Sequence, residues 1–189
     1  MSKPRMNLVG MTVVAALTAA AATGCTASSP VSTSPTPAPT PIVTATPTPT
    51  PSAEQLEATA VLERFWVTYD QVFRKEADPN DLYKVARGPI MEDFLQSYNQ
   101  TQGLGLTRQG SVDRFNLTPA EPTTQDGRTT VLVAACIDQT QLQMVDKNGE
   151  DKMSASSKTV TASEMTVQHW EGEGWFVTEG NPGTQGCTR

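Results

Sequence analysis

The sequence predicts an α+β domain in which N-terminal helices pack on a curved, mainly antiparallel sheet that closes over them as a cone. Two observations lead to this fold class. Apolar residues follow helical spacing over residues 53–100, and segments rich in Val, Thr and aromatic residues follow Gly105. Helices and strands that are segregated along a chain, rather than alternating, are typical of α+β domains.

The first predicted helix covers residues 53–75. Ser52, followed by Glu54 and Gln55, supplies an N-cap and an acidic first turn. The apolar residues of this segment are spaced by three and one, so they form one wide face: Ala58, Val61, Leu62, Phe65, Trp66, Tyr69, Val72 and Phe73.

Two shorter helices are expected after the break at Asp78-Pro79-Asn80. They cover residues 81–85 and 89–100. Pro89 suits the first turn of the second of these helices, because the amide hydrogen that proline lacks has no helical partner there. Gly103-Leu104-Gly105 then ends the helical part of the chain.

Five predicted strands follow, separated by turn residues. They cover residues 111–117, 129–138, 141–145, 159–170 and 174–179. Tight hairpins are expected at Asn148-Gly149 and at residues 171–174.

Two of these strands carry further information. Residues 131–137 are apolar on both faces, which predicts a central place in the sheet. In the long strand the apolar parity shifts between Ala162 and Met165, which predicts a β-bulge near Ser163.

The order of elements over residues 53–175 resembles the nuclear transport factor two-like superfamily, a group of cystatin-like cones. Ketosteroid isomerases, SnoaL-like polyketide cyclases and many exported actinobacterial lipoproteins belong to it. The resemblance rests on element order and implies a cone whose mouth is often lined by an Asp or His that acts as general acid or base.

Asp70 and His169 are the positions at which this resemblance implies chemistry. The residues around them favour structural roles. Asp70, flanked by Tyr69 and Gln71, is expected on the exposed side of its helix. His169 beside Trp170 is expected to bond a backbone carbonyl or water. Only a pair that meets in a cavity at hydrogen-bond distance would act as an acid–base dyad.

Aromatic residues supply candidates for the lining of a pocket. They are Trp66, Tyr69, Phe73, Tyr98 and Trp175. In a domain with few aromatic residues, most of these side chains are also expected to form the core.

His169 is the only histidine in the chain. We therefore expect no His-based zinc site, no Cys-His dyad and no Ser-His-Asp triad. The acidic segment 146–151 lacks the glycine spacing of a calcium loop and is expected to be a solvated turn. We therefore expect no metal and no cofactor.

The first 24 residues have the layout of a secretory signal peptide. A basic start with Lys3 and Arg5 precedes an apolar run that is too short to span a bilayer. The end of the run, residues 22–25, resembles the lipobox of bacterial lipoproteins, with Ala22 in place of the usual leucine. This resemblance implies that Cys25 carries fatty acyl chains such as palmitate. The alternative is a secreted protein that is cleaved near residues 20–22.

Residues 25–52 form the predicted anchor and tether, and residues 53–189 form one globular domain. The tether is almost wholly Thr, Ser, Pro, Ala and Val. Alternating prolines favour extended polyproline geometry at about 3.1 Å per residue, so the tether reaches up to roughly 80 Å.

The two cysteines other than Cys25 are Cys136 and Cys187. An even number of cysteines in an exported chain indicates a disulfide between them. The alternative is a pair of reduced, buried thiols.

Charge argues against nucleic acid as a partner. The chain has 14 basic and 20 acidic residues, and removal of Lys3 and Arg5 with the leader leaves 12 basic residues and a net charge of −8. Such a surface repels phosphate backbones and anionic headgroups, so membrane attachment is expected through the acyl chains.

The combined expectation is a lipid-anchored protein at the extracytoplasmic face of the cell membrane. Its domain is interpreted as a non-catalytic binding or accessory module of the cell envelope, whose partner is an envelope protein, a second copy or a small apolar ligand. Two alternatives remain open: an isomerase or cyclase that uses Asp70 or His169, and a prophage lipoprotein that blocks superinfection.

Overall fold

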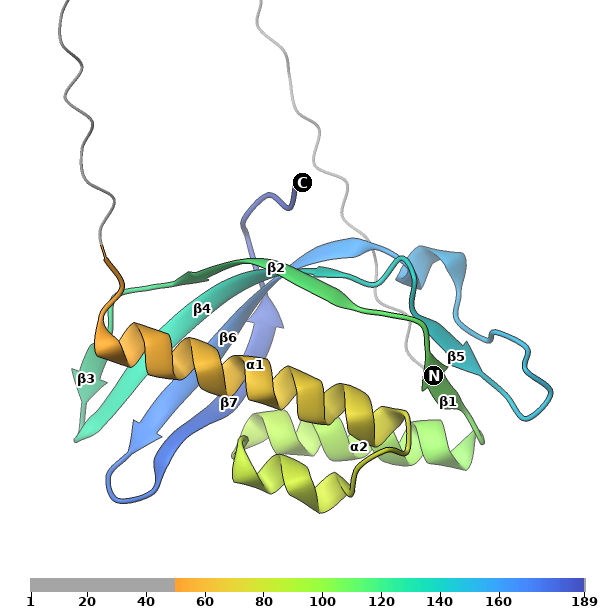
Figure 1. Cartoon of the computed structure of the whole chain (residues 1–189), viewed down its shortest axis with the longest axis horizontal. Coiled ribbons are helices and arrows are strands. Elements are labelled where there is room, and N and C mark those ends of the chain that lie inside the picture. The colour runs from red at the N-terminus through yellow and green to blue at the C-terminus, as the bar shows by residue number, and fades with distance from the viewer. Residues whose placement is uncertain (1–49, 189) are drawn as a thin grey trace, which may run out of the picture. The chain divides into compact units, whose positions relative to one another are not determined.

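The computed structural model describes residues 50–188, which have the predicted α+β architecture (Figure 1). Three helices come first: α1 (Ala53–Phe73), the short 3-10 helix η1 (Pro79–Lys84) and α2 (Pro89–Gly103). The predicted leader, Cys25 and most of the tether lie outside the described residues. None of the helices within residues 50–188 has both the length and the hydrophobicity that a membrane span requires.

A capping box starts α1 where the sequence predicts it. The Ser52 hydroxyl accepts the Gln55 amide hydrogen, and the Gln55 side chain accepts the Ser52 amide hydrogen at 2.7 Å. Gln55 is buried and donates to the Ala120 carbonyl at 3.1 Å, which ties the start of α1 to the segment after the first long strand. The helix ends at Phe73, two residues before the predicted end.

The main sheet has five antiparallel strands in the order β2-β4-β6-β7, with β3 beside β4. Their bounds are β2 (Asp113–Pro119), β3 (Thr123–Gln125), β4 (Arg128–Asp138), β6 (Val160–Trp170) and β7 (Gly174–Pro182). β4 pairs along both edges, so the prediction that residues 131–137 lie centrally is confirmed. The sheet arches over α1 and α2 (Figure 1).

A second, smaller sheet pairs β1 (Thr107–Gln109) with β5 (Gln143–Val145). The sequence does not predict β1 or β3, because three polar residues show no apolar alternation. Both predicted turns are present: Trp170 pairs with Gly174 across residues 171–173, and a single bridge between Val145 and Asp151 closes the turn at residues 146–150.

The predicted bulge near Ser163 is wrong. The β4–β6 register runs without interruption from Thr129 opposite His169 to Asp138 opposite Val160. At Ala162 the backbone carbonyl accepts the Gly183 amide hydrogen of the C-terminal tail.

Register shifts occur instead at two other places. One lies on β2 between Phe115 and Thr118 and contains Asn116, whose φ of 54° is a left-handed conformation that asparagine tolerates. The other lies between β6 and β7 and leaves Thr178 as an extra residue on β7. Bulges of this kind bend the strand that carries them.

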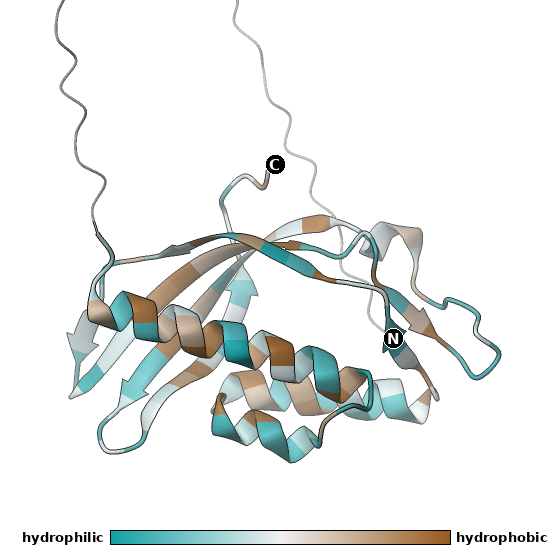
Figure 2. Ribbon diagram, in the orientation of Figure 1, coloured by the Kyte–Doolittle hydropathy of each residue, from teal (hydrophilic) through white to brown (hydrophobic). Residues whose placement is uncertain are grey.

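The core lies between the helices and the inner face of the sheet. Along α1 and the strands behind it, apolar and polar residues alternate (Figure 2). The largest side chains that are almost fully buried are Leu62, Val72, Leu82, Phe94, Val131, Val133, Val167 and Val177. Cys136 is completely buried as well, and alternation along β4 places it on the outer face, opposite to Val133 and Ala135 of this core.

A disulfide joins Cys136 on β4 to Cys187 in the C-terminal tail, with an S–S distance of 2.07 Å. It spans 51 positions of the chain. The tail thereby covers the outer face of the central strand, where the Gln185 amide also donates to the Cys136 sulfur at 3.8 Å.

The first prediction concerns this disulfide. A Cys187→Ser variant loses the cross-link without opening a cavity at buried Cys136, and we expect it to be less stable by about 4 kcal/mol because the unfolded chain regains loop entropy. Denaturant titration of the domain measures the loss. The reduced wild-type domain is the matched control and is expected to equal the variant; equal stability of the oxidised and reduced wild types would contradict the prediction.

Candidate functional site

A cleft of about 670 Å³ lies between the helices and the inner face of the sheet. α1 provides an aromatic wall, and β6 and β7 provide the opposite one. The residues that line it include Trp66, Tyr69, Phe73, Arg108, Arg114 and Met165. Its size is in the range of cavities that bind small molecules, about 300–1,000 Å³.

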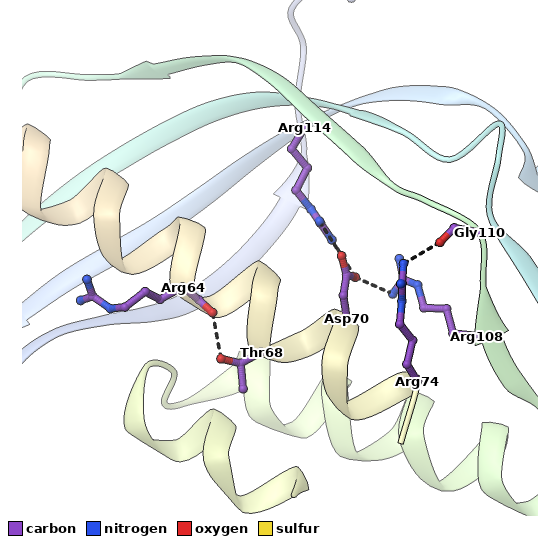
Figure 3. A network of polar contacts seen from close by, with 7 residues as sticks. All are labelled: Arg64, Thr68, Asp70, Arg74, Arg108, Gly110 and Arg114. Carbon is purple, nitrogen blue, oxygen red and sulfur yellow. Dashed lines mark hydrogen bonds and ion pairs between the residues drawn. The ribbon is translucent and has the colours of Figure 1, made fainter. Parts of the chain in front are cut away.

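An ion cluster centred on Asp70 joins α1 to both sheets at this cleft (Figure 3). Arg114 of β2 donates to both carboxylate oxygens of Asp70, at 2.8 and 3.0 Å. Arg108 of β1 makes an ion pair with the same carboxylate at 3.2 Å. Nearby, the Arg74 guanidinium donates to the Gly110 carbonyl.

The cluster is largely withdrawn from solvent. The exposed fractions of the side chains are 7% for Arg108, 14% for Arg114 and 18% for Asp70. Charges at this depth are costly unless they are paired, so each arginine depends on the shared carboxylate. Burial lowers the pKa of the Arg108 guanidinium, and the Asp70 charge opposes this shift.

Aromatic rings of α1 support both guanidinium groups. Arg108 lies 5.5 Å from the Tyr69 ring centroid, and Arg114 lies 5.3 Å from that of Trp66. Such cation–π contacts compensate part of the lost hydration. Burial also raises the pKa of the Tyr69 hydroxyl. The aromatic wall therefore holds the two cations in place at the cleft.

The expectation that Asp70 is an exposed helix residue is wrong. Its position in the last turns of α1 faces β1 and β2, which come from later parts of the chain. Sequence reasoning also missed Arg108 and Arg114. The only signal for Arg114 is its place in a predicted strand, where alternation puts it on the same side as Val112.

His169 lies away from this cluster. It is on β6 near the β6–β7 turn, opposite Thr129 and Trp175, and its ring centroid is 5.2 Å from that of Trp175. It does not line the cleft. The structure therefore does not bring Asp70 and His169 together as an acid–base dyad.

The five predicted lining residues separate into two groups. Trp66, Tyr69 and Phe73 line the cleft. Tyr98 stacks on Phe94 inside the helical layer, with ring centroids 5.7 Å apart. Trp175 donates its indole hydrogen to Glu57 at 2.7 Å on another part of the surface.

The acidic turn at residues 146–151 is bonded internally. Lys158 and backbone amides hold the Asp151 carboxylate, which lowers its pKa to about 2. Asp146 accepts the amide hydrogens of Asn148 and Glu150. In the part of the chain that the structure describes, no three His, Cys, Asp or Glu residues are arranged to hold a metal ion.

This arrangement favours binding over proton transfer. Both oxygens of Asp70 already accept hydrogen bonds or ion pairs from guanidinium groups, so the carboxylate would have to give up these partners to act as a base. Arginine side chains at neutral pH are donors only. The cleft thus offers cationic donors and apolar walls.

Comparison with known proteins shows similarity only to solved structures. No family model and no curated protein matches the chain. The intermembrane space region of the chloroplast protein ARC6 is 16% identical, with a TM-score of 0.42, and the match covers 70% of this chain and 98% of that one. TraH from the Gram-positive conjugative plasmid pIP501 is 14% identical, with a TM-score of 0.44 and coverage of 72% and 98%. A de novo β-sheet design is 14% identical, with a TM-score of 0.31 and coverage of 71% and 97%.

The second prediction tests the ion cluster. Asp70→Asn leaves two buried guanidinium groups without their counter-charge, and we expect it to lower the free energy of unfolding by about 2 kcal/mol. Asp81→Asn is the matched control, because it also removes an ion pair, to Lys84, but at the surface. Denaturant titration of both variants measures the difference. Equal effects of the two substitutions would contradict a structural role of the cluster.

Proposed function

We propose that this protein is a lipid-anchored binding module of the cell envelope, held at the extracytoplasmic face of the membrane. The leader, the lipobox-like segment before Cys25 and the proline-rich tether support the anchoring. A disulfide in the domain fits an oxidising compartment. The order of helices and strands supports a place in the nuclear transport factor two-like superfamily.

One observation carries the binding function: the open cleft between α1, α2 and the inner face of the sheet. Its walls are mainly apolar and aromatic, and two arginines and several uncharged polar side chains complete them, as in sites for small molecules. The proposed ligand is therefore a small, largely apolar molecule. The separation of Asp70 from His169 gives the isomerase or cyclase alternative no catalytic pair.

The third prediction concerns the anchor. The mature protein from its native membrane is expected to start at Cys25 and to carry the mass of a diacylglycerol, with further acyl groups where the host adds them. Cys25→Ser is expected to be released from the membrane fraction. Intact mass spectrometry and fractionation measure both. A wild-type protein cleaved near residue 22, with a free Cys25 thiol, would contradict the anchor.

The fourth prediction concerns the cleft. Ser97 of α2 lines the cleft and is half-buried, so Ser97→Phe is expected to fill part of its volume. We expect this variant to bind the neutral apolar fluorophore phenylnaphthylamine about tenfold more weakly than the wild type. The new ring takes up space that a ring of the fluorophore would fill, and burial of such a ring contributes more than about 1 kcal/mol to binding. Fluorescence titration measures the affinity.

Gln96→Phe is the matched control, since it adds the same ring to an exposed position of the same helix. This control is expected to bind phenylnaphthylamine as the wild type does. No binding by the folded wild type would contradict the proposed function.

A further inference from the structure

We propose that the cleft binds an apolar molecule with a single anionic head group, and that Arg108 and Arg114 receive that group. This inference rests on the proposed function and adds the chemical class of the ligand. Carboxylate, sulfonate and phosphate monoester groups share the required chemistry, because each presents several oxygens to a guanidinium fork.

The charges at the cleft are unequal. Among the described residues that line it, two are arginines and none is Asp or Glu. Asp70 reaches both arginines but does not line the cleft, and it supplies one negative charge for two positive ones. Arg74 is close enough to Arg108 to affect its pKa, and it adds a further positive charge.

Two further carboxylates, Asp113 and Asp138, lie on the strands beside the arginines. Asp113 and Asp138 lie opposite each other on β2 and β4, and Arg114 and Ile137 form the next pair. Arg114 and Ile137 both line the cleft. Since successive strand residues point to opposite faces, Asp113 and Asp138 belong to the other face of the sheet.

Donor groups at this site exceed the acceptors. The Nε atoms of Arg114 and Arg74 are buried and have no hydrogen-bond partner. Arg108 meets the carboxylate through an ion pair at 3.2 Å, whereas Arg114 makes two hydrogen bonds to it. Buried donors normally have acceptors, so these two atoms show a surplus of donors beside the cleft, although they are too buried to contact a ligand themselves.

The remaining walls explain why the ligand is apolar beyond its head group. Both arginines converge on one carboxylate, so the cationic region is confined to one part of the cleft. Aromatic and aliphatic side chains, among them Met165, line most of the rest, together with uncharged polar side chains such as Ser97 and Gln139. Gly180 lies close to Ile90 and Met165 on the opposite wall. A Cβ at this position would lie 3.2 Å from the Ile90 side chain and 3.3 Å from the Met165 sulfur, so a larger residue would crowd the cleft.

A matched pair of probes tests this inference on the folded protein. Anilinonaphthalene sulfonate and phenylnaphthylamine share one aromatic framework and differ in the sulfonate. The wild type is expected to bind the sulfonate about tenfold more tightly than phenylnaphthylamine. This ratio corresponds to the free energy of about one charge-assisted hydrogen bond. Decanoate or decyl phosphate is expected to displace the bound sulfonate, and decanol to displace it poorly.

Two substitutions at the ion cluster should act in opposite directions. Arg108→Gln removes one cation while Arg114 still pairs with Asp70, so it is expected to weaken sulfonate binding about tenfold and phenylnaphthylamine binding by a clearly smaller factor. Asp70→Asn frees both guanidinium groups and is expected to strengthen sulfonate binding severalfold. A merely structural role would make both variants weaker for both probes.

The outcomes separate the two proposals. If phenylnaphthylamine binds and the sulfonate binds no tighter, or if decanol displaces the sulfonate as well as decanoate does, the anionic head group is refuted and the apolar cleft stands. If neither probe binds the folded wild type, both proposals fail. If Asp70→Asn does not fold, Arg108→Gln tests the anionic head group without it, since that variant keeps the ion pair between Arg114 and Asp70. Loss of its preference for the sulfonate supports the proposal, and an unchanged preference refutes it.

Discussion

α1 has to bury a wide apolar face, and this requirement is the constraint on which the rest of the domain depends. Leu62 and Phe65 of that face are nearly inaccessible to solvent, covered by the inner residues of β4 and β6 within one core. A sheet must bend to cover a helix of 21 residues together with a second helix beside it. The irregular pairing at Asn116 and at Thr178 introduces bends into β2 and β7, the two outer strands of the four-strand path.

The Asp70 cluster connects this packing to the candidate site. A half-buried carboxylate with two buried arginines contributes less stability than an apolar contact of equal size, because all three groups lose hydration. What the cluster provides is geometry: it fixes two guanidinium groups against the rings of Tyr69 and Trp66, at one part of an otherwise apolar cleft. Binding sites with pre-positioned donors lose less entropy when a ligand arrives. The same interaction therefore joins α1 to both sheets and shapes what the cleft can accept.

Parts of the candidate site follow from local pattern, and parts do not. Trp66, Tyr69 and Phe73 share the apolar face of a helix whose periodicity is plain in the sequence, so their inward direction is predictable. Asp70 lies next to that face among polar neighbours, and nothing nearby marks it as buried. Its partner Arg114 is 44 residues away, and Arg108 belongs to a three-residue strand without alternation. A contact between such positions exists only after the sheet has formed over the helix.

The sequence by itself determined the types of the long elements, the central place of residues 131–137 and the two hairpin turns, because each depends on short-range periodicity or turn chemistry. The pairing of Cys136 with Cys187 followed from the sequence only together with the expectation that Cys25 is lipidated, and the structure contains this disulfide. Only the tertiary structure decided that the pairing of β4 with β6 runs past Ser163 without a bulge and that the C-terminal tail bonds to Ala162. It alone also placed Asp70 between two arginines and His169 outside the cleft. These outcomes depend on which distant surfaces are removed from water together, and a local pattern contains no information about its distant partner.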